Sequence, residues 1–445
     1  MTPSARIAAA IDLLKTLEEQ CFAPEARRRP ADAVASDFFR TRRFIGGGDR
    51  RVVSELAWGV VRQKLRLEWH LGRLGAAPTA RLLLLAQMLL GRSGDHGRGR
   101  QAAEAAFDDS HYGPAALDAA ERRVAASLDG RPLIDPAMPD GPRLNLPDWV
   151  LPALSARFGA GLAREAAALE VEAPLDLRVN LLRGDRDAAA VLLAGEGLAV
   201  VPTPMSPWGL RLPSRRPVTG TKAYRDGLVE VQDEGSQLIA LLADARPGMR
   251  VADYCAGAAG KTLAMAASMG NRGKITACDT SAARLEGAAK RLKRAGVDNA
   301  ERHLLAPGDR WAKRRAGSFD RVLVDAPCTG TGTWRRNPDG RLRTRPEDLA
   351  ELVVVQHDIL DRASELVRPG GRLVYATCSL LPQENEEQMD RFLARAPGFL
   401  PVPLERLWSE LRPGVDLPCA GPWLSLSPGG QGTDGFFCAV LERSA

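Results

Sequence analysis

The strongest constraint on the fold is an alternation of strand-like and helix-like segments that runs from Gln232 almost to the end of the chain. Short apolar runs typical of buried strands are each followed by a longer stretch with helical spacing. The strand-like runs cover 250–255, 274–279, 321–327 and 371–379, and the helical stretches begin at Lys261 and cover 281–295, 346–367 and 383–395. Repeated strand–helix units predict a doubly wound, Rossmann-like α/β domain over 232–445. Ligands of such a parallel sheet bind beyond the carboxyl ends of its strands.

Two further domains are predicted before this sheet. Residues 1–135 are predicted to form an all-helical domain, since apolar residues recur every three or four positions between breaks at "IGGGD" and "RSGDHGRGR". Five prolines between 128 and 147 predict a linker. Residues 145–231 are shorter and mixed in pattern, which predicts a small α+β module. Its expected elements are a helix near 148–171, a strand at 175–182, a helix at 185–196 and strands around 197–201 and 210–213.

The composition predicts a soluble cytoplasmic protein. Of 445 residues, 45% are hydrophobic and 26% are charged, no signal-like segment opens the chain, and the apolar run at 82–90 is too short to cross a bilayer. Seven cysteines without C-x-x-C spacing indicate reduced thiols rather than a disulfide framework or a zinc site. Five scattered histidines give no further metal candidate. We therefore expect no metal and no membrane partner, and a monomer.

The positive charge is concentrated near the N-terminus. The net charge is +6, and residues 1–100 alone hold 18 Lys and Arg against 10 Asp and Glu. The clusters "RRR" at 27–29, "RTRR" at 40–43 and "DRR" at 49–51 fit a surface that follows a phosphate backbone. They fit a solvated helical face equally well, so charge alone leaves both interpretations open.

The first strand–helix turn, "DYCAGAAGKT" at 253–262, ends in Gly-Lys-Thr but is not a nucleotide phosphate loop. Such a loop requires glycine five positions before its Gly-Lys pair, where this chain has Cys255, and a dinucleotide fingerprint fails on its glycine spacing too. A tight turn of small residues at a helix N-terminus remains, which lets a ligand approach the backbone. Asp279 ends the next strand, where a carboxylate can accept ribose hydroxyls or, alternatively, cap the helix near Ser281.

Two cysteines stand at the carboxyl ends of predicted strands. Cys328 lies in "DAPCTGTG", three residues after Asp325, and Cys378 lies in "YATCS" at the end of the next major strand. Either one alone is best interpreted as a packing residue. Together, at one rim of the sheet and beside a carboxylate, they indicate a chemical site.

These segments resemble a known family. "DAPCTGTGTWRRNPD", "GRLVYATCSLLPQENEEQ", "VQDEGSQLIALL" and "TDGFF" are similar to the S-adenosylmethionine-dependent RNA cytosine-C5 methyltransferases, which include bacterial small-subunit rRNA enzymes, and the likeness spans Asn145 to Arg443. More weakly, "GGGDRRVVSELAWGVVRQ" resembles the NusB-like RNA-binding domain of some members. The resemblance implies methyl transfer from S-adenosylmethionine to a cytosine in RNA, with 16S ribosomal RNA as the expected partner.

The resemblance also implies a role for each site residue. Cys378 is the expected nucleophile toward carbon 6 of cytosine, and Cys328 the residue that assists its release. Asp325 is expected to face N3 and the amino group of the base, and Lys261 to hold the base or the cofactor. The implied cofactor contacts are Cys255, Ala256, Gly257, Ala258, Ala259, Gly260, Lys261, Asp279, Asp325 and, in the Gly-Asp pair of "APGD", Asp309.

The chain departs from the family at one point. Members usually have Ala-Pro-Gly-Gly before the lysine, whereas residues 257–260 are Gly-Ala-Ala-Gly, so a reshaped loop with altered cofactor affinity is expected. A non-catalytic RNA-binding or ribosome-assembly factor that kept the fold is therefore one alternative. A cytosine methyltransferase of tRNA or DNA is another, although a DNA enzyme would use the Pro-Cys thiol as its nucleophile. The second thiol in "TCS" favours RNA.

The segment "RRNPDGRLRTRP", at 335–346, holds five arginines against one aspartate directly after the predicted active-site turn. It is interpreted either as a grip on phosphates that flank the target base or as a mobile, solvated loop. Because carbon 6 is reached only when the base leaves its stack, loops and single-stranded RNA are the expected targets.

Overall fold

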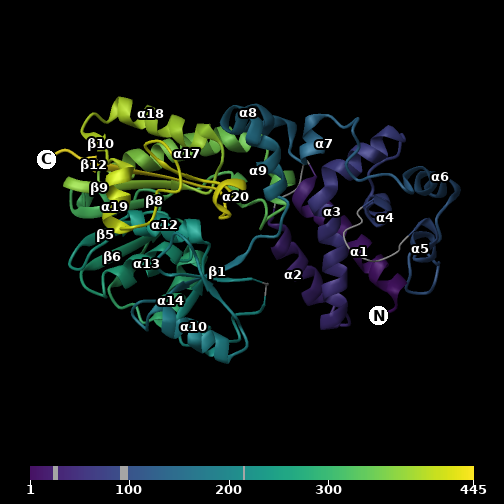
Figure 1. Ribbon diagram of the computed structural model, residues 1–445, viewed down its shortest axis with the longest axis horizontal. Helices are drawn as coiled ribbons and strands as arrows, with labels where there is room; N and C mark the ends of the chain where they lie inside the picture. Colours follow the sequence, from purple (N-terminus) through teal and green to yellow (C-terminus); the bar gives the residue numbers. More distant parts are fainter. Residues whose placement is uncertain (24–28, 91–98, 214–215) are drawn as a thin grey trace. The chain divides into compact units, whose positions relative to one another are not determined.

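The computed structural model describes residues 1–23, 29–90, 99–213 and 216–445 (Figure 1). The chain forms two compact units. The first comprises Met1–Glu170 with Asn337–Arg345, and the second comprises Val171–Arg336 with Pro346–Ala445. The predicted α+β module and the predicted sheet domain therefore fall largely within one compact unit.

The first unit is helical, as the sequence predicts. Its helices are α1 (Pro3–Leu17), α2 (Ala31–Thr41), α3 (Gly47–Arg73), α4 (Ala80–Leu90), α5 (Arg100–Ala105), α6 (Ala119–Leu128), α7 (Asp140–Leu144), α8 (Leu151–Phe158), α9 (Leu162–Ala168) and α16 (Gly340–Arg343). One turn of π-helix, Glu18–Phe22, extends α1. A single apolar cluster fills the space between α1, α3 and α4, and Asp118 and Glu121 form a reciprocal capping box that starts α6.

This unit extends beyond the predicted boundary at 135 because of one buried arginine. Arg66 of α3 is 4% exposed and forms a two-pronged ion pair with Glu170, with Nη1–Oε2 and Nη2–Oε1 distances of 2.7 Å. Its remaining donors bond the carbonyl oxygens of Pro142 and Arg143. The proline-rich segment predicted as a linker is thus fastened to α3 and contains α7.

The described residues of the N-terminal basic clusters include both ion-paired and exposed arginines. Arg29 and Arg40 both pair with Asp37, at 2.6 and 3.0 Å. Arg43 and Arg51 are exposed. Two residues of the "RRR" cluster, at 27 and 28, and the predicted break at 92–98 lie outside the described residues.

In the second unit, residues 171–231 build a small antiparallel sheet. Its strands β1 (Leu175–Val179), β2 (Val201–Pro202), β3 (Gly209–Leu212) and β4 (Val229–Val231) lie in the order β2-β3-β1-β4. Helices α10 (Arg186–Gly195) and α11 (Lys222–Arg225) pack against its apolar face. The predicted strand around 197–201 is only the two-residue β2, because Gly197 adopts a positive φ of 79° that ends the preceding helix.

The large sheet confirms the doubly wound fold. Its strand order is β10-β12-β9-β8-β5-β6-β7, with β11 paired to β12. The strands are β5 (Arg250–Asp253), β6 (Lys274–Asp279), β7 (Ala300–Leu304), β8 (Phe319–Asp325), β9 (Val367–Thr377), β10 (Phe399–Pro401), β11 (Leu424–Leu426) and β12 (Phe436–Arg443). The strands β9, β8, β5, β6 and β7 run parallel, whereas β12 pairs with β9 in antiparallel register. The prediction missed this antiparallel edge.

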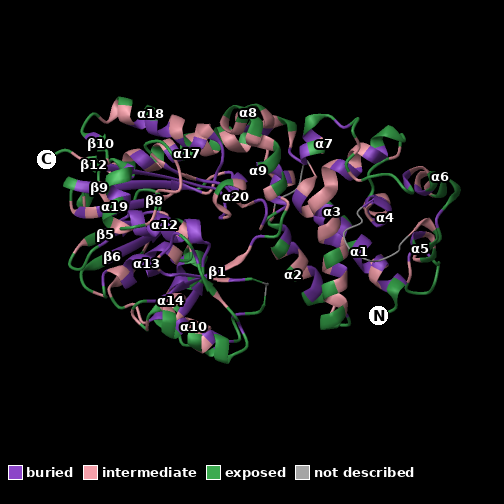
Figure 2. Cartoon of the chain, in the orientation of Figure 1, coloured by how far each residue is buried: buried purple, intermediate pink, exposed green. Residues whose placement is uncertain are grey.

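Helices cover both faces of the large sheet, whose strands are mostly buried (Figure 2). The helices α17 (Pro346–Ser364) and α18 (Glu386–Arg395) lie on one face, and α12 (Glu234–Leu242), α13 (Gly260–Ser268) and α19 (Leu404–Leu411) lie on the other (Figure 1). Helix α14 (Ala282–Ala295) follows β6, and the short α15 (Trp311–Arg314) and α20 (Pro428–Gln431) lie in loops. Burial on both faces explains why the central strands have continuous apolar runs.

Two glycines bring the active-site loop against the C-terminal region. Gly332 N donates to Cys378 O at 3.0 Å, and Gly435 N donates to Gly332 O at 2.8 Å. A Cβ on Gly332 would lie 2.2 Å from Gly435 O, which real side chains essentially never do. Only glycine at position 332 permits this approach of two backbones.

Gly332→Ala is therefore expected to lower the free energy of unfolding by about 1–3 kcal/mol, because the added methyl forces the backbones apart. Gly287→Ala is a matched control, since a Cβ there meets no atom within 4 Å on exposed α14. It should raise the free energy of unfolding by up to about 1 kcal/mol. Urea unfolding of both variants measures the difference, and equal stability of the two would contradict the crowding argument.

Candidate active site

A cavity of about 1390 Å³ opens at the carboxyl ends of β5, β6 and β8. The predicted cofactor contacts that line it are Cys255, Ala256, Gly257, Ala258, Gly260, Lys261, Asp279, Asp309 and Asp325. Ala259 does not line the cavity and is fully buried beneath the turn. Among the predicted catalytic residues, Lys261 and Asp325 line this cavity, whereas Cys328 and Cys378 lie outside its lining.

The Gly-Ala-Ala-Gly turn keeps a tight shape without the family's usual glycine and proline. Ala259 has a φ of +63°, a left-handed conformation that costs an ordinary residue about 1–2 kcal/mol. Ala259 N donates to Ala256 O at 2.8 Å, and Arg291 Nη1 of α14 donates to Ala258 O at 2.7 Å. Arg291 of α14 thus supports a turn whose backbone is strained at Ala259.

Asp279 connects this turn to the next helix. Its Oδ2 accepts from Gly257 N at 2.8 Å, and its Oδ1 accepts from Ser281 N at 2.7 Å. The N-cap of α14 is Ser281, whose side chain accepts from Arg284 N. The sequence left ribose binding and helix capping open for Asp279, and the structure assigns the N-cap position to Ser281 while Asp279 lines the cavity.

Asp309 is held beside the cavity by aromatic neighbours. His303 Nε2 and Asp309 Oδ2 lie 2.5 Å apart, and Trp311 N donates to Asp309 Oδ1 at 2.8 Å. The hydrogen bond from His303 holds the pKa of Asp309 below its usual value. The rings of His303 and Trp311 stack at 4.9 Å between centroids. Asp309 is therefore an ordered carboxylate at the cavity wall.

Lys261 and Asp325 form an ion pair at the centre of the cavity lining, with 2.6 Å between Nζ and Oδ2. Burial alone lowers the pKa of Lys261, but the Asp325 carboxylate outweighs burial and the pKa is raised above its ordinary value. Lys261 is thus protonated at neutral pH. Behind this pair, burial raises the pKa of Asp253 to about 6, although Thr262 Oγ1 donates to it at 2.6 Å.

The two cysteines meet, although 49 residues separate them along the chain. Their Sγ atoms lie 3.4 Å apart. The hydrogen bond to Cys378 is the largest cause of a pKa of Cys328 well above its ordinary value, with burial and the charges of Cys378 and Glu384 adding to it. Cys328 therefore remains a neutral thiol that can donate to Cys378. Pro327, which directly precedes Cys328, lines the cavity and so connects the sulfur pair to it.

The sequence analysis missed a residue that braces the Cys328 loop. Glu384 has no exposed surface, and it accepts from Thr329 N at 2.8 Å, from Thr329 Oγ1 at 2.5 Å and from Gln356 Nε2 at 2.9 Å. Gln356 Nε2 also donates to Pro327 O at 2.9 Å. The bonded residues 327 and 329 flank Cys328 on both sides. Glu384 lies in "LPQENEEQ", one of the motifs that carry the family resemblance, and this was its available signal.

Two arginines of the arginine-rich segment after this loop have a role that the sequence did not predict. Arg335 is 5% exposed and its Nε bonds Asp434 Oδ1 at 2.6 Å. Arg336 bonds Asp434 as well, and its Nη2 lies 2.8 Å from Asp233 Oδ2. These two arginines join three motif segments of the second unit. Neither a phosphate grip nor a solvated loop describes them, because buried carboxylates already occupy their donors.

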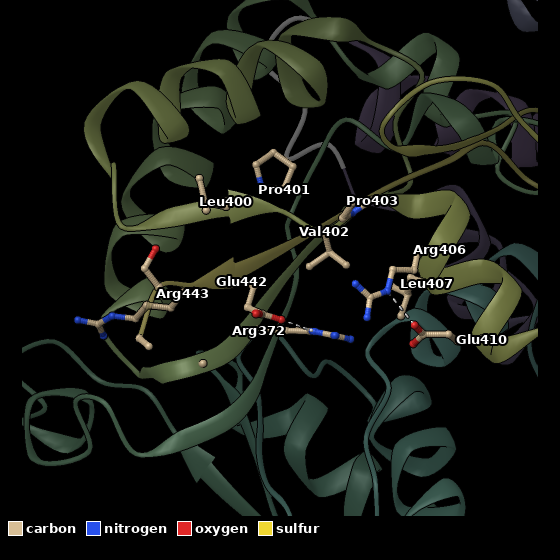
Figure 3. Close-up of a pocket in the computed structure, with 13 residues that line it drawn as sticks. Arg372, Leu400, Pro401, Val402, Pro403, Arg406, Leu407, Glu410, Glu442 and Arg443 are labelled. Carbon is tan, nitrogen blue, oxygen red and sulfur yellow. Dashed lines mark hydrogen bonds and ion pairs between the residues drawn. The ribbon is translucent and has the colours of Figure 1, made fainter.

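A second, smaller cavity of about 360 Å³ lies at the other end of the sheet, around β10 and the C-terminus (Figure 3). Its cations are engaged: Arg372 with Glu442 at 3.1 Å, and Arg406 with Glu410 at 3.0 Å. Arg443 Nη1 donates to Val367 O at 2.6 Å. None of the predicted site residues lines this cavity. We therefore place the active site at the larger cavity.

Among the residues that the structure describes, no group of three or more His, Cys, Asp or Glu side chains is placed to hold a metal ion. No helix formed by the described residues has the length and apolarity needed to cross a membrane.

Comparison with known proteins identifies related families over most of the chain. Residues 240–442 match the family model of the 16S rRNA methyltransferase RsmB/F, and residues 146–219 match that of the RsmF/B-like ferredoxin-like domain. The ribosomal RNA small subunit methyltransferase B of Salmonella paratyphi B is 31% identical over 90% of this chain and 92% of its own length. A probable methyltransferase of the same name from Synechocystis sp. is 30% identical over 94% of this chain and 96% of its own.

Solved structures show the same architecture. The structure of PH0851 aligns with 100% of this chain and 99% of its own, with a TM-score of 0.76 and 24% identity, which is a likeness of fold alone. A methyltransferase homologue from Pyrococcus horikoshii aligns with 69% of this chain and 99% of its own, with a TM-score of 0.60 and 28% identity. Fold and cavity together define an S-adenosylmethionine-dependent methyltransferase. The chain belongs to the 16S rRNA methyltransferase RsmB/F family.

The bracing by Glu384 predicts a defect in turnover rather than in cofactor binding. Glu384→Ala leaves Thr329 and Gln356 without their buried acceptor and frees the Cys328 loop, so kcat should fall by about 100-fold. Glu384→Gln can still accept from both nitrogens and should retain most of the activity. Methyl-transfer assays give kcat for both variants, and calorimetry gives the Kd of S-adenosylmethionine, which should not change. Wild-type kcat in Glu384→Ala would refute the bracing role.

Proposed function

We propose that this chain transfers a methyl group from S-adenosylmethionine to carbon 5 of a cytosine in RNA, through a covalent bond between Cys378 and the base. The observation that carries the proposal is the 3.4 Å contact between the Cys328 and Cys378 sulfur atoms. A packing role explains one buried thiol, but it gives no reason for two thiols at one rim beside an ion pair. Small-subunit ribosomal RNA, which the names of the relatives specify, is the proposed substrate. The reaction is then expected in the cytoplasm.

The cavity fits the cofactor. Its volume of about 1390 Å³ exceeds what a single small ligand needs and leaves room for a nucleobase. Asp279, Asp309 and the turn at 255–258 all line this cavity, and Asp279 is the carboxylate proposed to accept the ribose hydroxyls. When bound, S-adenosylmethionine supplies an electrophilic methyl group. The strained left-handed Ala259 does not obstruct this space, because it lies beneath the turn.

The chain's own residues activate the base. Carbon 5 of cytosine is a poor nucleophile, so a thiolate at Cys378 adds to carbon 6 and the ring gains enamine character. Electron density then moves toward N3, where the Lys261–Asp325 pair supplies one fixed positive and one fixed negative charge. Because Lys261 is held protonated by Asp325, it stabilises developing negative charge without losing its proton.

The second thiol acts at the end of the reaction. After methyl transfer a water molecule accepts the carbon 5 proton, the electrons of that C–H bond restore the double bond between carbons 5 and 6, and the bond between carbon 6 and Cys378 Sγ breaks with its electron pair returning to sulfur. Cys328 remains protonated because its pKa is raised, so its S–H can donate to the sulfur that departs. Stabilising that leaving thiolate is the proposed role of Cys328. The target base must be unstacked for this chemistry, which favours loops and single strands.

Two substitutions separate these roles. Cys378→Ala should abolish the transfer of labelled methyl to unmodified small-subunit rRNA, since no thiolate can add to the base. Cys328→Ala should transfer slowly and accumulate an RNA–protein adduct that survives denaturing gels. Cys419→Ala, which changes a thiol near β11 that does not line the cavity, is the control and should keep full turnover. Normal turnover by Cys378→Ala would defeat the proposal. An RNA–protein adduct formed by that variant would show that Cys328, and not Cys378, is the nucleophile.

A further inference from the structure

The small sheet turns a polar face away from its own core. Along β1, Leu177 and Val179 point into the apolar cluster, while Asp176, Arg178 and Asn180 alternate onto the other face. Asp176 is satisfied by Arg211, with distances of 2.6 and 2.8 Å. Asn180 Nδ2 donates to the carbonyl oxygens of two residues, 227 and 295. Arg178 lies between Asp176 and Asn180 and, unlike them, lacks a full set of hydrogen-bond partners among the described residues.

Arg178 is buried without a carboxylate of its own. It is 1% exposed, and its Nε donates to Gln232 Oε1 at 2.6 Å. Within the described ranges, no acceptor bonds either of its Nη atoms. Burial lowers the pKa of Arg178 to about 10, with Glu230 opposing and Arg291 adding to the effect. An incompletely neutralised guanidinium in a protein interior is expensive unless an anion joins it.

The nearest carboxylate is already taken. Glu230 stands directly opposite Arg178 in the β1–β4 pairing. Its Oε2 lies 3.1 Å from Arg291 Nη2, and its Oε1 bonds Arg294. Glu230 therefore pairs with two guanidinium groups, and it faces Arg178 only through the strand pairing.

The larger cavity is bordered by a partner of Arg178 and a partner of Glu230, whereas Arg178 itself is not among its lining residues. Gln232, Ser236 and Arg291 line the cavity, and Gln232 Nε2 donates to Ser236 Oγ at 3.1 Å. A Cβ on Gly260 would lie 3.8 Å from Gln232 Nε2 and 4.0 Å from Arg291. Gln232 and Arg291 thus lie beside Gly260, the residue that precedes Lys261.

We propose that Arg178, Gln232 and Arg291 form a subsite for a phosphodiester group of the RNA strand beside the target nucleotide. This inference rests on the proposed function. A phosphodiester carries one negative charge and no cation, and guanidinium groups bind it through paired hydrogen bonds. The cofactor's carboxylate is a poorer match, because its own ammonium and sulfonium groups would add positive charge to an already cationic cluster.

Filter binding of unmodified small-subunit rRNA, transcribed in vitro, over a series of KCl concentrations tests the subsite with the full-length chain. Arg178→Met should raise the Kd for this RNA about tenfold. The slope of log K against log salt should decrease in magnitude by about 0.7–0.9, the equivalent of one phosphate. The Kd of S-adenosylmethionine, from calorimetry, should stay at the wild-type value. Arg225→Met removes an equal charge from the exposed end of α11 and should leave the slope unchanged.

Stability provides the second readout. Because burying an unneutralised charge opposes folding, Met at position 178 should leave the Tm unchanged or raise it. A fall of more than about 5 °C would make Arg178 a structural residue and overturn the inference. An RNA affinity of Arg178→Met equal to that of the wild-type chain would overturn the inference too. So would a variant that binds S-adenosylmethionine more weakly while its RNA affinity is unchanged. Failure of the wild-type chain to methylate the RNA would instead reject the proposed function, before any variant is compared.

Discussion

The contact between two sulfur atoms depends on the parallel pairing of β8 and β9. Their register places Asp325 opposite Ala376, so both strands end at the same level of the sheet. Cys328 and Cys378 follow at the next turns of the chain and meet at 3.4 Å. A shift of this register would separate the sulfurs and also move Asp325 away from Lys261. The register of the sheet therefore determines which side chains come together at the candidate site, and the surrounding loops adjust their exact positions.

Buried polar contacts hold in place the loops that follow these strands. Glu384 fastens the Cys328 loop from one side through backbone and side-chain donors. The approach of Gly332 to Gly435 and the ion pair between Arg335 and Asp434 fasten it from the other. Each of these groups is costly to bury alone and is stable only with its partner, which makes the loop positions interdependent. Arg178 differs because its charge remains incompletely neutralised, which is why we assign it to a ligand.

Much of this arrangement is predictable from sequence, since its signals are local. Buried parallel strands produce continuous apolar runs, so the sheet domain and the two strand-end cysteines followed from pattern alone. The antiparallel β10 and β12 were missed because β10 is a short edge strand and because β12, which pairs with β9 in antiparallel register, does not continue the pattern of parallel strand–helix units. The predicted boundary at 135 does not take into account the ion pair between Arg66 and Glu170. This pair joins residues that are distant in sequence, so no local pattern predicts it.

Long-range pairing also explains the errors at the site. Arg335 and Arg336 form a basic run in sequence, but their carboxylate partners lie about a hundred residues away. Glu384 likewise bonds a residue that is distant in sequence, Thr329, in the loop that follows β8. The family motifs located these residues, whereas only the structure gives them their separate roles.

The most direct test of the account uses RNA that contains 5-fluorocytidine, in which fluorine replaces the proton that must leave. The wild-type chain should then stop at the covalent stage, and mass spectrometry of the digested adduct should locate the nucleotide on the peptide that contains Cys378. Attachment to the Cys328 peptide, or the absence of any adduct while the protein methylates ordinary RNA, would contradict the central claim.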